Sequence, residues 1–325
     1  MKQFLKHTAR VLGFAFGLIV ILIAVSFVMT PKDNTERAGV LSERAYGFLA
    51  EPENSLDALF FGDSEGYRAF IPLQMWDEYG ITSYVCNTSS QQLYLTEKML
   101  SQALENQAPK YVFMETNALY RYAPYSDILM DRFSNLLPVL RYHDHWKHFS
   151  LRDFSPKIDY THIEPFKGYA FRDEIEAVPE EKLDHMRADS GEAKISRRSL
   201  NLLSRIARIC REHDAELILI STPSTVNWNM KRHNRVQKLA DKLGATYIDM
   251  NLLADEIPID WSVDSYDAGD HLNYTGAVKA TAYLGKYLSE AGLPDRRSDE
   301  ALAAEWNENL EEFRKFLKEK GFEMN

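Results

Sequence analysis

Apolar residues along this chain are gathered into one long run and several short ones. The long run covers residues 11–29 (VLGFAFGLIVILIAVSFVM) and contains no ionisable side chain. A helix of that length spans roughly 28 Å, which is close to the thickness of the hydrocarbon core of a bilayer. The pattern therefore predicts one membrane-spanning helix at 11–29.

Basic residues precede this run, whereas those after it are offset by acidic ones. Lys2, Lys6 and Arg10 lie on the N-terminal side. By the positive-inside rule, residues 1–10 are expected in the cytoplasm and everything after the helix outside it. This predicts a single-pass protein of the cell membrane with an extracytoplasmic domain.

A cleaved signal peptide is the alternative for the same segment. Ala24-Val25-Ser26 loosely resembles the small-x-small pattern of a cleavage site. The apolar run, however, is longer than the 7–15 residues usual for a signal peptide. The length favours an uncleaved anchor, and cleavage stays open as the second interpretation.

The short apolar runs are bounded by polar turns and alternate with helical patterns. Runs of this kind suit strands that are buried on both faces of a parallel sheet. Five are found, at residues 56–61, 83–86, 111–114, 217–220 and 246–250. Helical spacing is found at residues 92–107, 200–213, 236–243 and 274–291. The alternation predicts a three-layer α/β domain with about five parallel strands.

Other segments lie outside this alternation. Residues 30–54 are polar and interrupted by prolines, which predicts a stalk before a domain at 55–295. Residues 120–190 are long and rich in aromatic and charged residues, so we expect an inserted helical or irregular subdomain or lid beside the site. Residues 296–325 predict a C-terminal amphipathic helix, with Ser298 as its N-cap. It is expected to pack on its own domain, with docking to a partner or membrane as the lesser alternative.

Composition and charge exclude several classes of protein. The chain has 325 residues, with 38 basic and 48 acidic side chains and a net charge of -10. A nucleic-acid-binding protein is expected to have a basic excess, so no nucleic-acid partner is predicted. Two cysteines, Cys86 and Cys210, are too few for a disulfide scaffold or a cysteine-rich metal site. In an oxidising exterior they could pair, but two buried thiols are an equal alternative.

Metal and cofactor sites have little support. His143, His145 and His148 lie close together in the chain, but a polar helix explains them better than a metal site does. The sequence contains no Walker-type loop and no Gly-x-Gly-x-x-Gly motif. We therefore expect neither a metal nor a cofactor.

Residues at the ends of the predicted strands offer a specific chemistry. Ligands of an open parallel sheet bind outside the carboxyl ends of its strands. Ser64 follows the first strand, residues 87–90 the second, and Asn117 the third, while residues 266–273 follow the fifth and include a histidine and carboxylates. A hydroxyl nucleophile, a base, an orienting carboxylate and amide donors are the parts that acyl transfer needs.

Three of these segments resemble the sequence blocks of the SGNH (GDSL-type) hydrolase family. Phe61-Gly62-Asp63-Ser64 resembles block I, Glu115-Thr116-Asn117 resembles block III, and the segment from Asp267 to His271 resembles block V. The resemblance covers roughly residues 55–120 and 200–292. It implies a flavodoxin-like α/β/α fold, with Ser64 as nucleophile, His271 as base, and Asn117 and the Ser64 backbone N–H as oxyanion donors.

The chain departs from the family pattern in two blocks. Block II normally offers a glycine N–H, whereas this chain has Asn87-Thr88-Ser89-Ser90, so an N–H of Ser89 or Ser90 is the expected substitute. Block V usually reads Asp-x-x-His, but Asp267 lies four residues before the histidine and Asp270 directly precedes it. Adjacent side chains of an extended backbone point apart, which favours Asp267, and both carboxylates stay candidates.

The anchor and the resemblance together predict a function. We expect a serine esterase or acyltransferase that acts on O-acyl groups of a cell-envelope polysaccharide through an acyl-serine intermediate. The layout is similar to that of family members of the teichoic-acid D-alanylation and alginate-type O-acetylation kinds, which implies a membrane acyltransferase as a further partner. The alternative is a non-catalytic envelope protein of the same fold that binds polysaccharide or such a partner.

Overall fold

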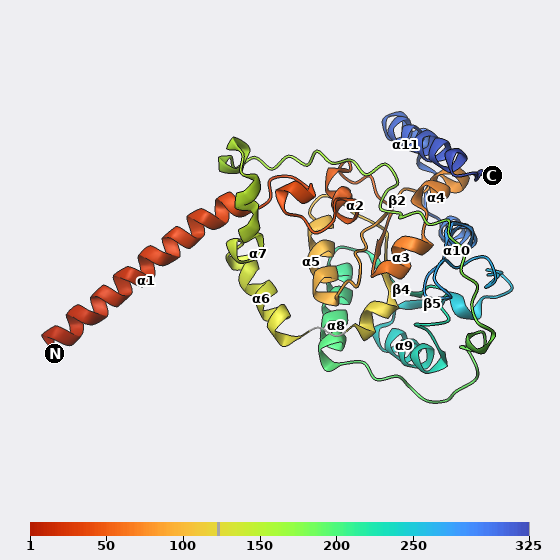
Figure 1. Cartoon of the computed structure of the whole chain (residues 1–325), viewed down its shortest axis with the longest axis horizontal. Helices are drawn as coiled ribbons and strands as arrows, with labels where there is room; N and C mark the ends of the chain where they lie inside the picture. The colour runs from red at the N-terminus through yellow and green to blue at the C-terminus, as the bar shows by residue number, and fades with distance from the viewer. Residues whose placement is uncertain (122–123, 325) are drawn as a thin grey trace. The chain divides into compact units, whose positions relative to one another are not determined.

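The computed structural model describes residues 1–121 and 124–324, and within them the chain forms two compact units. The first unit, here called the anchor unit, comprises residues 1–43 and 124–162. The second, the α/β unit, comprises residues 44–121 and 163–324. Figure 1 shows the elements of both units.

The α/β unit is built on one five-stranded parallel sheet. Its strands are β1 (Ala58–Phe61), β2 (Ser83–Val85), β3 (Tyr111–Glu115), β4 (Glu216–Ser221) and β5 (Thr246–Asp249). They are arranged in the order β2-β1-β3-β4-β5, and each pair is parallel. This is the flavodoxin-like order, so the predicted fold class is confirmed.

Helices cover the sheet. They are α2 (Glu43–Tyr46), α3 (Ser64–Ala69), α4 (Pro72–Tyr79), α5 (Leu93–Ala103), α8 (Arg197–Glu212), α9 (Met230–Leu243), α10 (Tyr274–Glu290) and α11 (Glu300–Glu319). Helix α10 packs against α3 and α4, while α5 packs against α8. Alternate side chains of a strand point to opposite faces of the sheet, and the even-numbered residues of β1 join the core under α3, α4 and α10. There the Phe60 ring stacks on Phe70 and Phe113, with centroids 4.8 and 4.7 Å apart.

The C-terminal helix α11 packs its apolar face onto the α/β unit. Trp306 lies 5.4 Å from Trp76 between ring centroids and is fully buried. The helix begins one residue later than predicted, because the Asp299 side chain rather than Ser298 caps it by accepting from the Leu302 N–H.

Two predicted boundaries are wrong. The stalk does not extend to residue 54, because Ala45 and Phe48 are buried in the α/β unit. The segment 120–190 is not one subdomain. Residues 124–162 belong to the anchor unit, whereas residues 163–190 run along the α/β unit, where the buried Lys167 ammonium pairs with Glu51 at 2.8 Å.

The anchor unit contains the predicted membrane segment within a longer helix, α1 (Lys2–Met29). Its apolar part is long enough to cross a membrane, as in a membrane anchor or a signal sequence. The other helices of the unit are α6 (Tyr125–Leu136) and α7 (Val139–Tyr142). The described residues also form short 3₁₀ helices, which are η1 (Glu36–Ala38), η2 (Gly47–Ala50), η3 (Thr116–Tyr120), η4 (His143–His148), η5 (Leu151–Phe154), η6 (Glu180–Lys182), η7 (Met250–Leu252) and η8 (Arg296–Ser298).

Candidate active site

The turn after strand β1 places Ser64 at the first position of helix α3. Gly62 has φ 153°, and a Cβ atom there would lie 2.5 Å from the Cβ of Glu115, so only glycine fits. Asp63 then caps the helix by accepting from the Glu65 N–H at 3.1 Å. Ser64 is therefore held at the carboxyl edge of the sheet, at the N-terminus of a helix.

Ser64, His271 and Asp267 are joined by hydrogen bonds. The Oγ of Ser64 lies 2.7 Å from Nε2 of His271, and Nδ1 of His271 lies 2.6 Å from Oδ2 of Asp267. The backbone N–H of His271 donates to the other carboxylate oxygen at 2.7 Å. With Nδ1 donating to Asp267, Nε2 is free to accept the serine proton. The arrangement can therefore move a proton from Ser64 to His271 and hold the resulting imidazolium.

The structure distinguishes the two candidate carboxylates. Oδ1 of Asp270 lies 3.8 Å from Nδ1 of His271, beyond hydrogen-bond range, and instead accepts from Nδ2 of Asn227. Burial alone would raise the pKa of Asp267, but the hydrogen bonds from the His271 ring and backbone lower it overall. Asp267 is thus the charged group that orients the imidazole.

A tight loop brings Asp267 and His271 into this geometry. The intervening residues Ala268 and Gly269 both have positive φ, 54° and 95°. The Gly269 N–H donates to Ser265 Oγ at 2.8 Å, and its carbonyl accepts from the Thr225 N–H at 2.9 Å. The spacing of four residues, one longer than in the family pattern, is accommodated by these two left-handed residues.

The expected oxyanion donors lie in different environments. Within residues 1–121 and 124–324, the Ser64 N–H has no hydrogen-bond acceptor, as is usual at a helix N-terminus. Asn117 is buried nearby, but its Nδ2 donates to Asp63 Oδ2 at 3.0 Å and its Oδ1 accepts from Arg232 at 2.9 Å. Ser89 and Ser90 lie in an exposed turn after β2. The structure thus brings Asn117 towards Ser64 through Asp63 and leaves the two serines at the surface.

Two buried carboxyl groups near Ser64 are given no role by the sequence: Glu115 stands in the block III segment, and Glu65 directly follows the block I segment. Burial raises the pKa of Glu65 well above its usual range, and the Asp63 carboxylate raises it further. Burial and the carboxylates of Asp63 and Glu65 do the same to the pKa of Glu115. Glu65 accepts from Thr222 Oγ1 at 2.9 Å and from Asn227 Nδ2 at 2.7 Å. Glu65 therefore ties the serine helix to the segment after β4.

Two arginines of the site were also missed. Nε of Arg121 donates to Asp63 Oδ2 at 2.7 Å, and the Arg232 guanidinium stacks 4.2 Å from the Tyr120 ring while it holds Asn117. Neither belongs to a motif, and Arg232 lies 115 residues from Asn117. Only the tertiary fold brings Arg232 of α9 to Asn117 and Tyr120 of η3, so no signal in the sequence identifies this arginine.

Among the described residues, one cluster of three side chains could offer ligands to a metal ion. The side chains of Asp267, Asp270 and His271 offer oxygen and nitrogen atoms that lie within 4.8 Å of one another. Both ring nitrogens of His271 are already hydrogen-bonded, so a metal there would have to displace Ser64 or Asp267. His145 is buried against Asp153 at 2.9 Å.

Both cysteines are buried free thiols in the structure. Burial raises the pKa of Cys86 well above its ordinary value and raises the pKa of Cys210 to about 12. Neither thiol is therefore a reactive nucleophile at neutral pH.

Comparison with known proteins finds similarity in structure alone. No family model and no curated protein matches the sequence. Among solved structures, the psychrotrophic esterase EstA from Pseudoalteromonas sp. is similar at 9% identity and a TM-score of 0.38, over 72% of this chain and 98% of that one. A GDSL-like lipase from Bacteroides thetaiotaomicron is similar at 11% identity and a TM-score of 0.37, over 76% and 96% of the two chains. Because these identities and TM-scores are low, the chemistry of the present chain is inferred from its own residues.

Proposed function

We propose that this chain is a membrane-anchored serine esterase or O-acyltransferase of the SGNH type. One observation carries the proposal, namely the continuous relay from Ser64 through His271 to Asp267, with hydrogen bonds of 2.7 and 2.6 Å. A serine hydroxyl bonded to an imidazole that is itself oriented by a carboxylate is the arrangement of an activated nucleophile.

The reaction follows from the geometry. Ser64 Oγ attacks the ester carbonyl while His271 Nε2 takes its proton, and Asp267 stabilises the imidazolium. The oxyanion that forms is received by the free Ser64 N–H and by the Asn117 amide, which turns from Asp63 to do so. His271 returns the proton to the departing alcohol, leaving an acyl group on Ser64. Water or a sugar hydroxyl then attacks this ester, with His271 again as base, and frees the serine.

The substrate class follows from the anchor. Helix α1 is apolar, and the basic residues before it favour an extracytoplasmic α/β unit. We infer that the substrate is an O-acylated polysaccharide of the cell envelope and that a membrane acyltransferase is a donor or acceptor partner. The net charge of -10 gives no attraction to an anionic polymer, so the helix rather than electrostatics holds the enzyme at its substrate.

A fluorophosphonate probe tests the catalytic proposal directly, since it labels only an activated serine. The full chain in detergent should be labelled, the Ser64→Ala variant should not, and Ser101→Ala should be labelled like the wild type. Ser101 is a suitable control because it is exposed on α5 and only donates to a backbone carbonyl. Unlabelled wild-type protein, or labelling that survives Ser64→Ala, would contradict the proposal.

A second candidate function has one observation in its favour. The Asn117 amide is engaged by Asp63 and Arg232, and the serines after β2 lie at the surface, so the oxyanion site is not preformed. This fits a non-catalytic envelope protein that binds polysaccharide or a partner acyltransferase. Such a protein would bind an acylated glycan equally well after Ser64→Ala and would release no acyl group, which mass spectrometry of the glycan distinguishes from turnover or transfer.

A further inference from the structure

Helix α6 of the anchor unit buries polar side chains and exposes apolar ones. Its buried residues are Asp131 and Ser134, which are 8% and 4% exposed. Large apolar side chains lie instead on its surface, and Leu136 is 77% exposed. A helix that faces water shows the opposite arrangement, with apolar residues inside. The outward face of α6 is therefore suited to an apolar medium.

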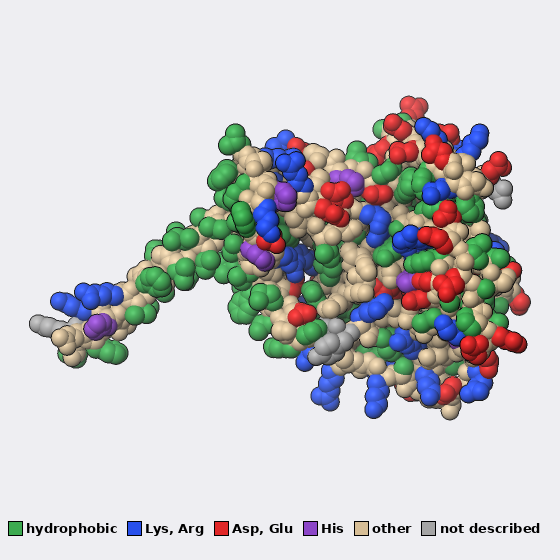
Figure 2. Space-filling view, in the orientation of Figure 1, with side chains coloured by type: hydrophobic (Ala, Val, Ile, Leu, Met, Phe, Trp, Pro, Cys, Tyr) green, Lys and Arg blue, Asp and Glu red, His purple; other side chains and the backbone are tan. Residues whose placement is uncertain are grey.

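The exposed apolar surface continues beyond α6 through the rest of the segment 125–158. Its members in the helices are Leu129, Met130, Phe133, Leu136 and Leu140. The 3₁₀ helices η4 and η5 and the residue after η4 add Trp146, Phe149, Leu151 and Phe154. A contiguous apolar surface of this kind marks an interaction site rather than ordinary solvent exposure. Figure 2 shows hydrophobic side chains on this part of the anchor unit as well as along α1.

This surface is continuous with the last turns of the apolar helix α1. Elements α7, η4 and η5 contact α1, and the Val139 N–H donates to Ser26 Oγ at 3.2 Å. Ser26 lies one turn before the end of the helix at Met29. If α1 spans a membrane, residues 125–158 lie at the level where its apolar run meets the head groups, which is where aromatic and amphipathic segments concentrate.

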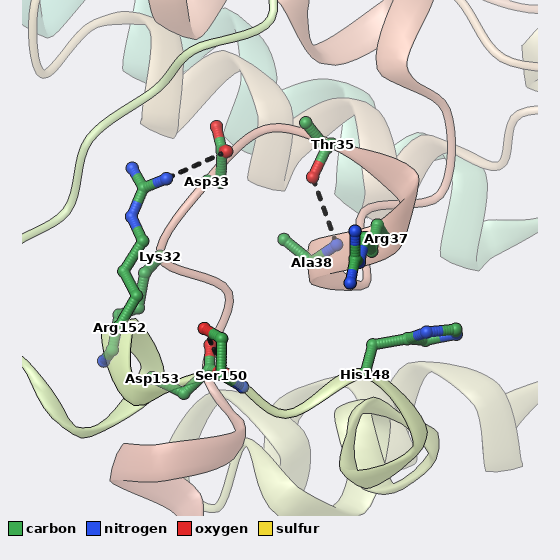
Figure 3. A pocket seen from close by; sticks show the side chains of 9 residues that line it. All are labelled: Lys32, Asp33, Thr35, Arg37, Ala38, His148, Ser150, Arg152 and Asp153. Atoms are coloured by element: carbon green, nitrogen blue, oxygen red, sulfur yellow. Dashed lines mark hydrogen bonds and ion pairs between the residues drawn. The ribbon is translucent and has the colours of Figure 1, made fainter.

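A basic pocket opens beside the same end of α1 (Figure 3). Its volume is about 270 Å³, close to the lower limit of small-molecule sites. Lys32, Arg37, His148 and Arg152 contribute its basic side chains. Lys32 follows Met29 by three residues, so its Cα lies within about 10 Å of the end of the helix.

Part of the positive charge of this pocket is uncompensated. Of the two acidic lining residues, Asp33 pairs with Arg152 at 3.3 Å and Asp153 pairs with His145 at 2.9 Å. Lys32 is buried, and its ammonium donates to the Phe27 carbonyl at 2.9 Å and lies 4.2 Å from the Phe27 ring centroid. Among the described residues no carboxylate lies within ion-pair distance of Lys32 or Arg37. The Asp153 carboxylate attracts the Lys32 ammonium at longer range, but within the described residues neither Lys32 nor Arg37 has an ion-pair partner, which favours an anion as the occupant.

We propose that the anchor unit docks on the outer leaflet through the apolar surface of residues 125–158 and that its basic pocket binds the phosphate of an anionic phospholipid. The inference depends on α1 being retained as a membrane span and does not depend on the chemistry at Ser64. The docking holds the anchor unit in the head-group layer, a position that one membrane-spanning helix alone does not fix.

Trp146 provides a probe inside this surface. The other four tryptophans, Trp76, Trp228, Trp261 and Trp306, belong to the α/β unit, so the difference between the wild type and Trp146→Phe reports on the anchor unit alone. The full chain is reconstituted in phosphatidylcholine nanodiscs that contain a minor fraction of phosphatidylglycerol, at about physiological salt. In one sample only the phosphatidylglycerol chains are brominated, and in the other an equal fraction of phosphatidylcholine.

The expected result is quenching of Trp146 in both samples, with an apparent preference for phosphatidylglycerol of about fivefold, the factor that one cationic side chain near an anionic leaflet contributes. Arg37→Gln and His148→Gln, both exposed side chains, should reduce the preference, whereas Arg132→Gln, an exposed arginine of α6 outside the pocket, should not.

Three outcomes overturn the proposal. Absence of Trp146 quenching would show that the surface does not enter the leaflet. Equal quenching by the two brominated lipids would show that the pocket does not select the anionic head group. Loss of the preference on adding millimolar inorganic phosphate, with quenching intact, would identify free phosphate rather than lipid as the occupant. Fluorophosphonate labelling of Ser64 is measured on the same samples, so a failure of the catalytic proposal is seen separately.

Discussion

Helices α11 and α6 are both amphipathic, yet they direct their apolar faces oppositely. In α11, Trp306 and Phe313 are fully buried against the α/β unit. In α6, Phe133 is half exposed, while Asp131 and Ser134 are buried. Hydrophobic spacing alone does not distinguish which way the apolar face of each helix points. The comparison teaches that the direction of an apolar face, and hence the medium that it meets, is decided by what the rest of the unit offers to cover it.

The units also differ in what their buried polar groups do. In the anchor unit, Asp131 forms an ion pair with Arg141 and Ser134 donates to a backbone carbonyl, so both groups are satisfied locally. In the α/β unit, Asp63 joins β1 to Arg121 and Asn117 from the segment after β3, and the relay of Ser64 is built on top of it. In the anchor unit the buried polar groups lie opposite an exposed apolar face. In the α/β unit the buried polar groups position the nucleophile Ser64.

The largest expected effect separates the units by function. Ser64→Ala should lower kcat/KM for ester hydrolysis by about 10⁴-fold or more, because among the described residues no other hydroxyl is bonded to His271. The same variant should leave the quenching of Trp146 by brominated lipid unchanged. Esterase assays and nanodisc fluorescence on one preparation check both, and a coupled loss of the two would show that the division between the units is wrong.

The next effect sharpens the assignment of the orienting carboxylate. Asp267→Asn should lower kcat by about 10³- to 10⁴-fold, since an amide no longer holds the required tautomer of His271. Asp270→Asn should change kcat by less than about tenfold, because Asp270 is bonded to Asn227 rather than to the imidazole. Steady-state kinetics of the two variants decide it, and equal losses would contradict the geometry.

A matched pair of phenylalanine truncations tests the two helices themselves. Phe313→Ala should lower the free energy of unfolding by about 3–5 kcal/mol, because the ring is fully buried, with its centroid 5.0 Å from that of Phe166. Phe133→Ala should change it by no more than about 0.5 kcal/mol in detergent, since half of the ring is already exposed. Urea unfolding followed by tryptophan fluorescence measures both. Similar losses would mean that α6 is covered by protein.

The smallest effect concerns the buried carboxyl of Glu65. The unfolded chain releases this proton near the ordinary value of about 4.3, whereas the folded chain keeps it to higher pH, because burial and Asp63 raise the pKa. Stability is thus lost as pH rises through the interval between the two values. Glu65→Gln should flatten this decline as the pH rises above the ordinary value of about 4.3, and Glu308→Gln on the exposed face of α11 should not. Unfolding at several pH values checks it, and an unchanged slope in Glu65→Gln would show that the carboxyl ionises in the folded chain.

Much of the fold follows from local patterns. The five strand positions were predicted to within two residues at each end, because strands that are buried on both faces read as continuous apolar runs. The stalk and the insertion were misjudged for a related reason. Residues 44–54 and 163–190 have little periodicity, and their burial comes from single contacts with distant segments, such as the pair of Lys167 with Glu51.

The sequence by itself determined the apolar run at 11–29, the alternation of strands and helices, and the candidates Ser64, Asn117 and His271, because each depends on neighbours in the chain. Tertiary structure alone decided that Asp270 is bonded to Asn227 instead of the imidazole, the outward face of α6, and the buried charges around Asp63. Each of these is set by groups more than 40 residues apart in the chain or, for α6, by which of its faces the rest of the anchor unit covers. The physical reason is that hydrophobic periodicity is a local property, whereas burial of charge and the medium at a surface depend on which segments the fold brings together.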